Sequence, residues 1–232
     1  MFDKLKDDIK VVLEKDPAAR SFFEVLFTYS GVRAMWRHRR AQWFFKHNMK
    51  FIARVISQRT KRKTGIEIHP GAKIGSRVFI DHGTGVVIGE TAEIGNNVVM
   101  YQGVTLGGTG KDTGKRHPTI EDDVMISSGA KVLGPIRIGK GSKIGAGSVV
   151  LKDVPPYSTV VGVPGRIVKQ FNIKISDMDQ KLPDPILEEF GRLNKRIITL
   201  EEKLGVHACK YSLSNSLDNN PESEEDKNHE TL

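Results

Sequence analysis

The sequence predicts a mixed fold, with an α-helical N-terminal region followed by a parallel β-helix. Three observations lead to this prediction. Apolar residues recur every six positions between residues 66 and 150, and glycine directly follows many of them. Residues 1–63 instead show apolar residues at helical spacing. Ten of the sixteen aromatic residues lie within residues 1–51, which is typical of a packed helical cap.

Residues 1–63 form the predicted helical region. Leu5, Ile9, Val12 and Leu13 would share one face of an amphipathic helix. Their spacing of three or four positions is the spacing that places side chains on one helical face. We expect this face to pack against the following domain.

Residues 64–170 form the predicted β-helix. A period of six fits neither a helix nor simple strand alternation, but it fits short strands joined by tight turns. Three hexapeptides make one triangular coil. The inward positions of the repeat are Ile68, Ile74, Ile80, Ile88, Ile94, Met100, Leu106, Ile120, Ile126, Val132, Ile138, Ile144 and Val150.

The repeat is interrupted twice. Ile80 and Ile88 are eight positions apart, and Leu106 and Ile120 are fourteen apart. Extra residues in a stacked coil must leave the stack and run over the surface, and departures from a regular scaffold tend to be functional. The interruptions contain His82 and His117, which are therefore candidate site residues.

Residues 171–210 form a predicted C-terminal segment, followed by an acidic tail at 211–232 that we expect to be disordered. Within 184–205 apolar residues alternate by four and three, which favours a heptad helix, either in a coiled coil or packed along the prism. These residues are Ile186, Phe190, Leu193, Ile197, Leu200 and Leu204.

Composition excludes several classes. The single cysteine, Cys209, provides neither a disulfide framework nor a CxxC metal site. There is no run of about 18 apolar residues and no signal-peptide pattern, so we expect a cytoplasmic protein with no membrane partner. The net charge is +8, and the sharpest basic cluster is RTKRK at 59–63. No zinc-finger, RRM or KH pattern accompanies it, so we expect no nucleic-acid partner.

Three segments carry a family resemblance: EIHPGAKIGSRVFIDHGTGVVIGETAEIGNNV, VTLGGTGKDTGKRHPTIEDDVMI and KIGAGSVVLKDVPPYSTVVGVPGRIV. They closely resemble bacterial serine O-acetyltransferases of the shorter type, from about Asp16 to Lys169. The resemblance implies a left-handed parallel β-helix of the hexapeptide acyltransferase superfamily. It also implies transfer of acetyl from acetyl-CoA to the L-serine hydroxyl, the first step of cysteine biosynthesis.

Direct acyl transfer to a hydroxyl requires a general base, and histidine suits this role near neutral pH. His82 is the candidate base. Glu67 precedes it in the chain by slightly less than one coil, so the two residues would lie on neighbouring coils, and Glu67 is expected to orient His82. The family usually has Asp at the position of Glu67.

Serine is a zwitterion, and the resemblance assigns residues to each end of it. Asp16 and Asp81 resemble the carboxylates that bind its ammonium group, while Arg116 and His117 resemble the contacts to its carboxylate. Asp16 in DPAA also has the pattern of a helix N-cap followed by Pro at N1.

The remaining assignments concern coenzyme A and assembly. Five residues match or fit family positions that hold acetyl-CoA: Gly108, Thr109, Ser128, Lys143 and Ala146. No metal is expected. The family forms homotrimers, sometimes paired into hexamers as a dimer of trimers, and is commonly inhibited by cysteine. In many members the C-terminus, here Leu232, binds O-acetylserine sulfhydrylase.

Three alternatives remain open. A sugar or antibiotic acetyltransferase shares the fold, but the charged residues suited to a zwitterion argue against it. A zinc lyase like the gamma-class carbonic anhydrases needs a further histidine five positions after His117, where the chain has Asp122. A purely structural or binding prism is the third alternative.

Overall fold

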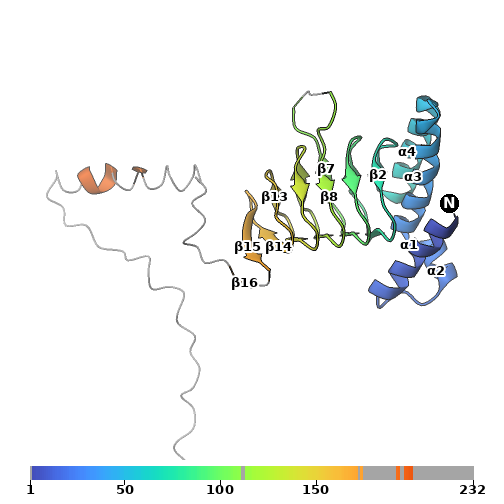
Figure 1. The fold of residues 1–232 in the computed structure, drawn as a ribbon, viewed down its shortest axis with the longest axis horizontal. Coiled ribbons are helices and arrows are strands. Elements are labelled where there is room, and N and C mark those ends of the chain that lie inside the picture. Colours follow the sequence, from blue (N-terminus) through green and yellow to red (C-terminus); the bar gives the residue numbers. More distant parts are fainter. Residues whose placement is uncertain (1, 111–112, 172, 175–191, 194–195, 201–232) are drawn as a thin grey trace, which may run out of the picture. The chain divides into compact units, whose positions relative to one another are not determined.

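The computed structural model describes residues 2–110, 113–171, 173–174, 192–193 and 196–200. Figure 1 shows helices at the N-terminal end, followed by a stack of short strands. The helices are α1 (Phe2–Lys15), α2 (Phe22–Thr28), α3 (Ser30–Lys46) and α4 (Lys50–Thr64). The predicted order of a helical region and then a parallel β-helix is confirmed.

The strands form three sheets, one for each side of a triangular prism. The first sheet contains β1 (Glu67–Ile68), β4 (Val87–Ile88), β7 (Thr105–Gly107), β10 (Lys131–Leu133) and β13 (Val149–Val150). The second contains β2 (Lys73–Ile74), β5 (Glu93–Ile94), β8 (Thr119–Ile120) and β11 (Arg137–Ile138). The third contains β3 (Phe79–Ile80), β6 (Val99–Met100), β9 (Met125–Ile126), β12 (Lys143–Ile144), β14 (Ser158–Val161), β15 (Arg166–Gln170) and β16 (Ile173–Lys174).

Strand register explains both interruptions of the repeat. Val87 pairs with Thr105, and the step between them is one regular coil of three hexapeptides. The coil from Glu67 to its partner Val87 is slightly longer than this, and the coil from Thr105 to its partner Lys131 is much longer. The extra residues therefore lie in two turns, one before β4 and one before β8, while the strands themselves stay in register.

The interior of the prism is a column of stacked apolar side chains. Ile88, Leu106 and Val132 follow one another in adjacent coils of the first sheet, and each is at most 1% exposed. Burying a side chain of this size stabilises the fold by about 1.5–3 kcal/mol. The core depends on this repetition, because each coil covers the apolar residues of the next.

Helices close the N-terminal end of the prism. Ala34 and Met35 of α3 belong to the same buried cluster as the prism interior. Helices α1 and α2 pack on the outer face of the third sheet, where Phe79 and Val99 are buried beside Ile9 of α1. This packing brings the end of α1 to the end of β3.

The last strands of the third sheet close the other end. β14 pairs with β15, and β15 with β16, in antiparallel fashion. In the C-terminal part of the chain, residues 192–193 and 196–200 are helical; the rest of the predicted heptad helix 184–205 and the tail at 211–232 lie outside the described residues. None of the helices described is long and apolar enough to span a membrane.

Candidate active site

The turn before β4 presents His82 to solvent. Three parallel turns connect the third sheet to the first at the same corner of the prism, at residues 101–104, 127–130 and 145–148. The turn at 81–86 is longer than these, and both His82 (φ 56°) and Gly83 (φ 78°) have left-handed backbone conformations. The His82 side chain is 73% exposed, with its Nε2 3.9 Å from Asp81 Oδ2. We call this edge of the prism the His82 corner.

Asp16 lies beside this corner. It directly follows α1, and its Oδ2 accepts a hydrogen bond of 2.6 Å from the Tyr29 hydroxyl. The hydrogen bond from Tyr29, a second from the Ala18 amide and the nearby His82 ring lower the pKa of Asp16. The charge of Asp81 is in turn one of the causes that raise the pKa of Tyr29 to about 12, after the hydrogen bond to Asp16 and burial. Asp16, Asp81 and His82 are therefore brought together.

The predicted N-cap at Asp16 is wrong. Residues 17–18 form a turn, and α2 begins only at Phe22, where Ser21 is the N-cap. The Asp16 Oδ1 accepts a hydrogen bond of 2.8 Å from the amide of Ala18, two positions on, which is an Asx-turn. Asp-Pro favours such a turn as readily as a helix start, and only a short connection separates α1 from α2.

Glu67 lies on β1 and is bound by α4. Lys61 Nζ donates to its Oε2 at 2.6 Å, and Gln58 Nε2 donates to its Oε1 at 3.3 Å. The hydrogen bond from Lys61 lowers the pKa of Glu67, so this group remains a carboxylate at neutral pH. Among the hydrogen bonds of the described residues, none joins Glu67 to His82.

The long loop before β8 presents a second cluster at the next corner of the prism. The turns that connect the first sheet to the second lie here, at 69–72, 89–92, 108–118 and 134–136, and Figure 1 shows the loop after β7 extending away from the prism. We call this edge the His117 corner. Arg116 donates to Glu90 Oε2 at 3.1 Å.

His117 is held in one tautomer. Its Nδ1 accepts from the Thr91 amide at 3.2 Å and lies 2.9 Å from the Thr91 hydroxyl, so the ring proton is on Nε2. Burial, followed by the charge of Arg116, lowers the pKa of His117. The neutral ring therefore has an N–H group to offer to a carboxylate or an acyl oxygen.

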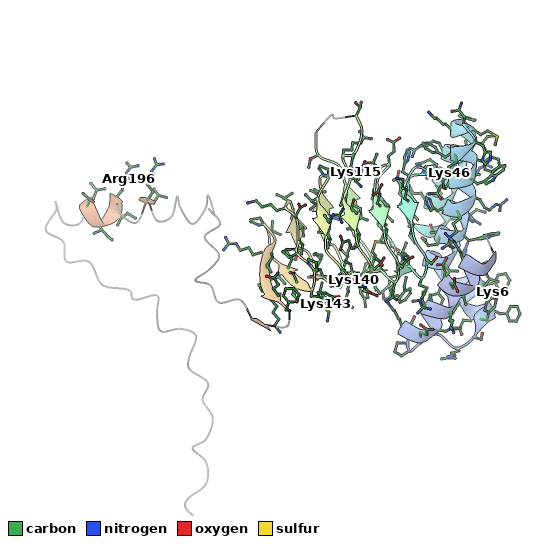
Figure 2. All side chains as sticks on the ribbon, in the orientation of Figure 1. Lys6, Lys46, Lys115, Lys140, Lys143 and Arg196 are labelled. Carbon is green, nitrogen blue, oxygen red and sulfur yellow. The ribbon has the colours of Figure 1, made fainter. Side chains whose placement is uncertain are left out.

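The predicted coenzyme A residues lie at both corners, except for Lys143. Ser128 and Ala146 occupy equivalent positions in stacked turns of the His82 corner, where the Gly147 amide donates to the Ser128 carbonyl at 2.9 Å. Gly108 and Thr109 lie in the loop of the His117 corner. Lys143 lies on β12, and Figure 2 shows it on the side of the prism away from Lys115 and the loop.

One chain thus places its candidate residues on two edges of the first sheet. The His82 corner carries the carboxylates and the candidate base, and the His117 corner carries Arg116 and His117. Among the described residues, no hydrogen bond or ion pair joins the two clusters. No group of three or more His, Cys, Asp or Glu residues in the described part of the chain could hold a metal ion.

Sequence comparison identifies the family. Residues 117–152 match the family model "Bacterial transferase hexapeptide (six repeats)". The chain is 62% identical to the serine acetyltransferase of Bacillus licheniformis over 205 residues, which cover 88% of this chain and 95% of that protein. It is 56% identical to the Staphylococcus aureus enzyme, over 85% of this chain and 93% of that one.

The chain belongs to the serine acetyltransferase family. It is therefore an acyltransferase, as the sequence predicted. Solved structures of the family agree: Neisseria gonorrhoeae serine acetyltransferase in complex with serine matches with a TM-score of 0.70 at 43% identity, over 72% of this chain and 69% of that one. A serine acetyltransferase in complex with cysteine matches with a TM-score of 0.71 at 45% identity, over 72% and 69%.

Sequence reasoning missed the residues that hold the side chains of the candidate site in this acetyltransferase. Thr91 orients His117, Lys61 binds Glu67, and Tyr29 binds Asp16. Aligning the chain coil by coil would have found Thr91, because residue 91 lies at the His117 corner, one coil before the loop that contains His117. Tyr29 and Lys61 come from helices, whose placement on the prism no repeat spacing predicts.

Proposed function

We propose that this serine acetyltransferase transfers the acetyl group of acetyl-CoA to the hydroxyl of L-serine, giving O-acetyl-L-serine and CoA. The observation that carries the proposal is the grouping of an exposed histidine with two carboxylates where the repeat is interrupted. The serine oxygen attacks the thioester carbonyl and its proton passes to the base. The C–S bond then breaks, and the departing thiolate takes the proton from the base to leave as CoA. The thioester is already activated, so no covalent enzyme intermediate is needed.

His82 acts as the general base. Its exposure leaves the ring free to turn toward a bound hydroxyl. Glu67 is proposed to orient the ring. For this, the Glu67 carboxylate must either rotate away from Lys61 or contact His82 while it stays bound to Lys61. A carboxylate on the far ring nitrogen would fix the tautomer of the base.

The two ends of serine bind to opposite charges. Asp16 and Asp81 bind the ammonium group, and Arg116 binds the carboxylate through its planar fork of donors, together with Nε2–H of His117. Cysteine has the same two ends, so we propose that it competes with serine and inhibits the enzyme. This regulation fits a first step of cysteine biosynthesis.

Acetyl-CoA is the co-substrate, and no metal takes part. Backbone groups at Gly108 and Thr109 approach its phosphates or amides, Ser128 and Ala146 line the pantetheine arm, and Lys143 pairs with a phosphate. The stacked turns of the His82 corner offer a continuous edge along which a long, flexible cofactor can lie beside His82.

A homotrimer would complete the site. The His82 and His117 corners of one chain lie on two edges of the first sheet, whereas copies arranged around a threefold axis can place the His82 corner of one against the His117 corner of the next. Exposed aromatics on the helical region, including Phe23 (70%) and Phe27 (69%), would pair two trimers into a hexamer. We propose a cytoplasmic enzyme with neither nucleic-acid nor membrane partners.

The chain is proposed to contain a helical region at 1–63, a catalytic β-helix at 64–170, a segment at 171–210 with the heptad helix 184–205, and a tail at 211–232. The tail would carry Leu232 into O-acetylserine sulfhydrylase. Co-elution with that enzyme, lost when residues 223–232 are removed, would support this contact; absence of co-elution at low and moderate salt would exclude it.

Thiol release from acetyl-CoA tests the main proposal. The acceptors are serine, threonine, homoserine, a galactoside and chloramphenicol, each assayed with and without a chelator. We expect the highest kcat/KM with serine and no effect of the chelator. If the galactoside or chloramphenicol gave the highest kcat/KM, that acceptor and not serine would be the substrate.

A further inference from the structure

Tyr29 lies where the helical region meets the His82 corner. It ends α2 and precedes α3, and Gly31, two positions later, packs directly on the backbone of β3. A methyl group added at Gly31 would overlap the carbonyl oxygen of Ile80. Since Asp81 directly follows Ile80, this contact fixes the position of Tyr29 relative to the candidate ammonium site.

The Tyr29 hydroxyl has one strong partner. It donates to Asp16 Oδ2 at 2.6 Å, while the other carboxylate oxygen accepts from the Ala18 amide at 2.8 Å. The two donors hold opposite oxygens, so the Asp16 carboxylate is fixed in orientation. Each oxygen keeps a further lone pair with which to accept from a substrate ammonium group.

We propose that Tyr29 is a serine-positioning residue that acts through Asp16, holding its carboxylate toward Asp81 and His82 so that acceptors bearing an ammonium group are selected. This inference rests on the proposed function, in which Asp16 and Asp81 bind the ammonium group of serine. Tyr29 takes no part in the proton transfer itself.

The effect of this hydroxyl is separable from that of the ring. The Tyr29 ring is partly buried and packs against the apolar cluster that includes Ile9 of α1 and Val25 of α2. Tyr29→Phe keeps that packing and removes only the donor to Asp16. Thr28→Val is the matched control, because the neighbouring Thr28 hydroxyl donates within its own helix to the Glu24 carbonyl.

The experiment measures steady-state kinetics for Tyr29→Phe, Asp16→Asn, the double variant and Thr28→Val. Hydrogen bonds to charged groups predict about a tenfold to hundredfold rise in KM for serine in Tyr29→Phe, with kcat and the KM for acetyl-CoA within about threefold of wild type. The preference for serine over 3-hydroxypropionate, which lacks the amine, should fall by the same factor.

The double variant decides whether Tyr29 acts through Asp16. In the Asp16→Asn background, Tyr29→Phe should change KM by less than about twofold, since interacting residues are not additive. A full second effect there would overturn the inference, as would an unchanged KM in Tyr29→Phe when Asp16→Asn raises it. An unchanged KM in Asp16→Asn would remove both the ammonium assignment and the role of Tyr29.

Discussion

Glu67 is bound by Lys61 and Gln58 in this structure, and not by His82. A carboxylate bound at 2.6 Å by a lysine is charged and held, so it can serve His82 only through its remaining lone pairs or after a rotation. This pair is half-exposed, and such ion pairs contribute little to stability. The contribution of Glu67 is therefore better measured by enzyme turnover than by folding stability.

Substitutions at Glu67 test this role. We expect Glu67→Gln to lower kcat, because an amide cannot stabilise the imidazolium, and Glu67→Asp to have a milder effect because the charge remains. Lys61→Met serves as the control, since it removes the competing partner and leaves the carboxylate. If Glu67→Gln turned over serine as fast as wild type, Glu67 would be structural.

Gly89 lies under His117, and any side chain there would meet the imidazole ring. Gly89 does not have a left-handed backbone, so alanine is allowed by the backbone itself. We expect Gly89→Ala to displace His117 and lower kcat/KM for serine about as much as His117→Ala. In the His117→Ala background the added methyl has room, so the second change should have little further effect. Additive losses in the double variant would contradict this account.

The strands and turns show which features the sequence can predict. The period of six located all three sheets, because the same inward residue repeats in every coil and stacks on its neighbours. The two interruptions located His82 and His117, because extra residues can only leave the stack at a corner. Asp16 was assigned to the site by resemblance, but its local structure was mispredicted, since Asp-Pro is compatible with both a turn and a helix start.

The partners of the site residues could not be predicted in the same way. Tyr29 and Asp16 lie on either side of α2, and their hydrogen bond forms because α1 and α3 both pack at the end of β3. The distance between two helices on a prism is set by tertiary packing of their apolar faces. No spacing in the sequence encodes it.

Helix α3 contains a buried histidine that should make stability depend on pH. Burial, followed by the charge of Arg39, lowers the pKa of His38 from 6.5 to about 3. Between these pH values the unfolded chain binds a proton at His38 and the folded chain does not. Stability is therefore lost as the pH falls below 6.5, by up to about 1.4 kcal/mol per pH unit from this group.

Urea unfolding at pH 7, 6 and 5 measures this loss, at one fixed protein concentration because the proposed assembly would also contribute to stability. His38→Leu should reduce the loss between pH 7 and pH 5, whereas His47→Leu, at an exposed position after the same helix, should not. An equal loss in the wild type and His38→Leu would assign the acid sensitivity to other groups, among them His69 and His117, whose pKa values burial also lowers.

At the scale of the whole molecule, the candidate residues of one chain lie on two corners of the prism, and this arrangement has a testable consequence. If each site combines the His82 corner of one copy with the His117 corner of its neighbour, neither corner works without a second chain. A site built within one chain would instead need the two clusters to meet around the first sheet.

If the chain forms the proposed homotrimer, mixed trimers distinguish these possibilities. His82→Ala alone should lose about 100- to 10,000-fold in kcat, as general-base variants do, and Arg116→Ala should lose binding of the serine carboxylate.

Co-expression of the two variants with different affinity tags, followed by purification on both tags, yields trimers that contain both variants. In such a trimer about a third of the shared sites are intact, because at one interface the Arg116→Ala copy supplies His82 and its His82→Ala neighbour supplies Arg116. Recovery toward that level would place the site between copies, whereas activity no higher than that of the separate variants would place it within one chain, where every copy carries a defect.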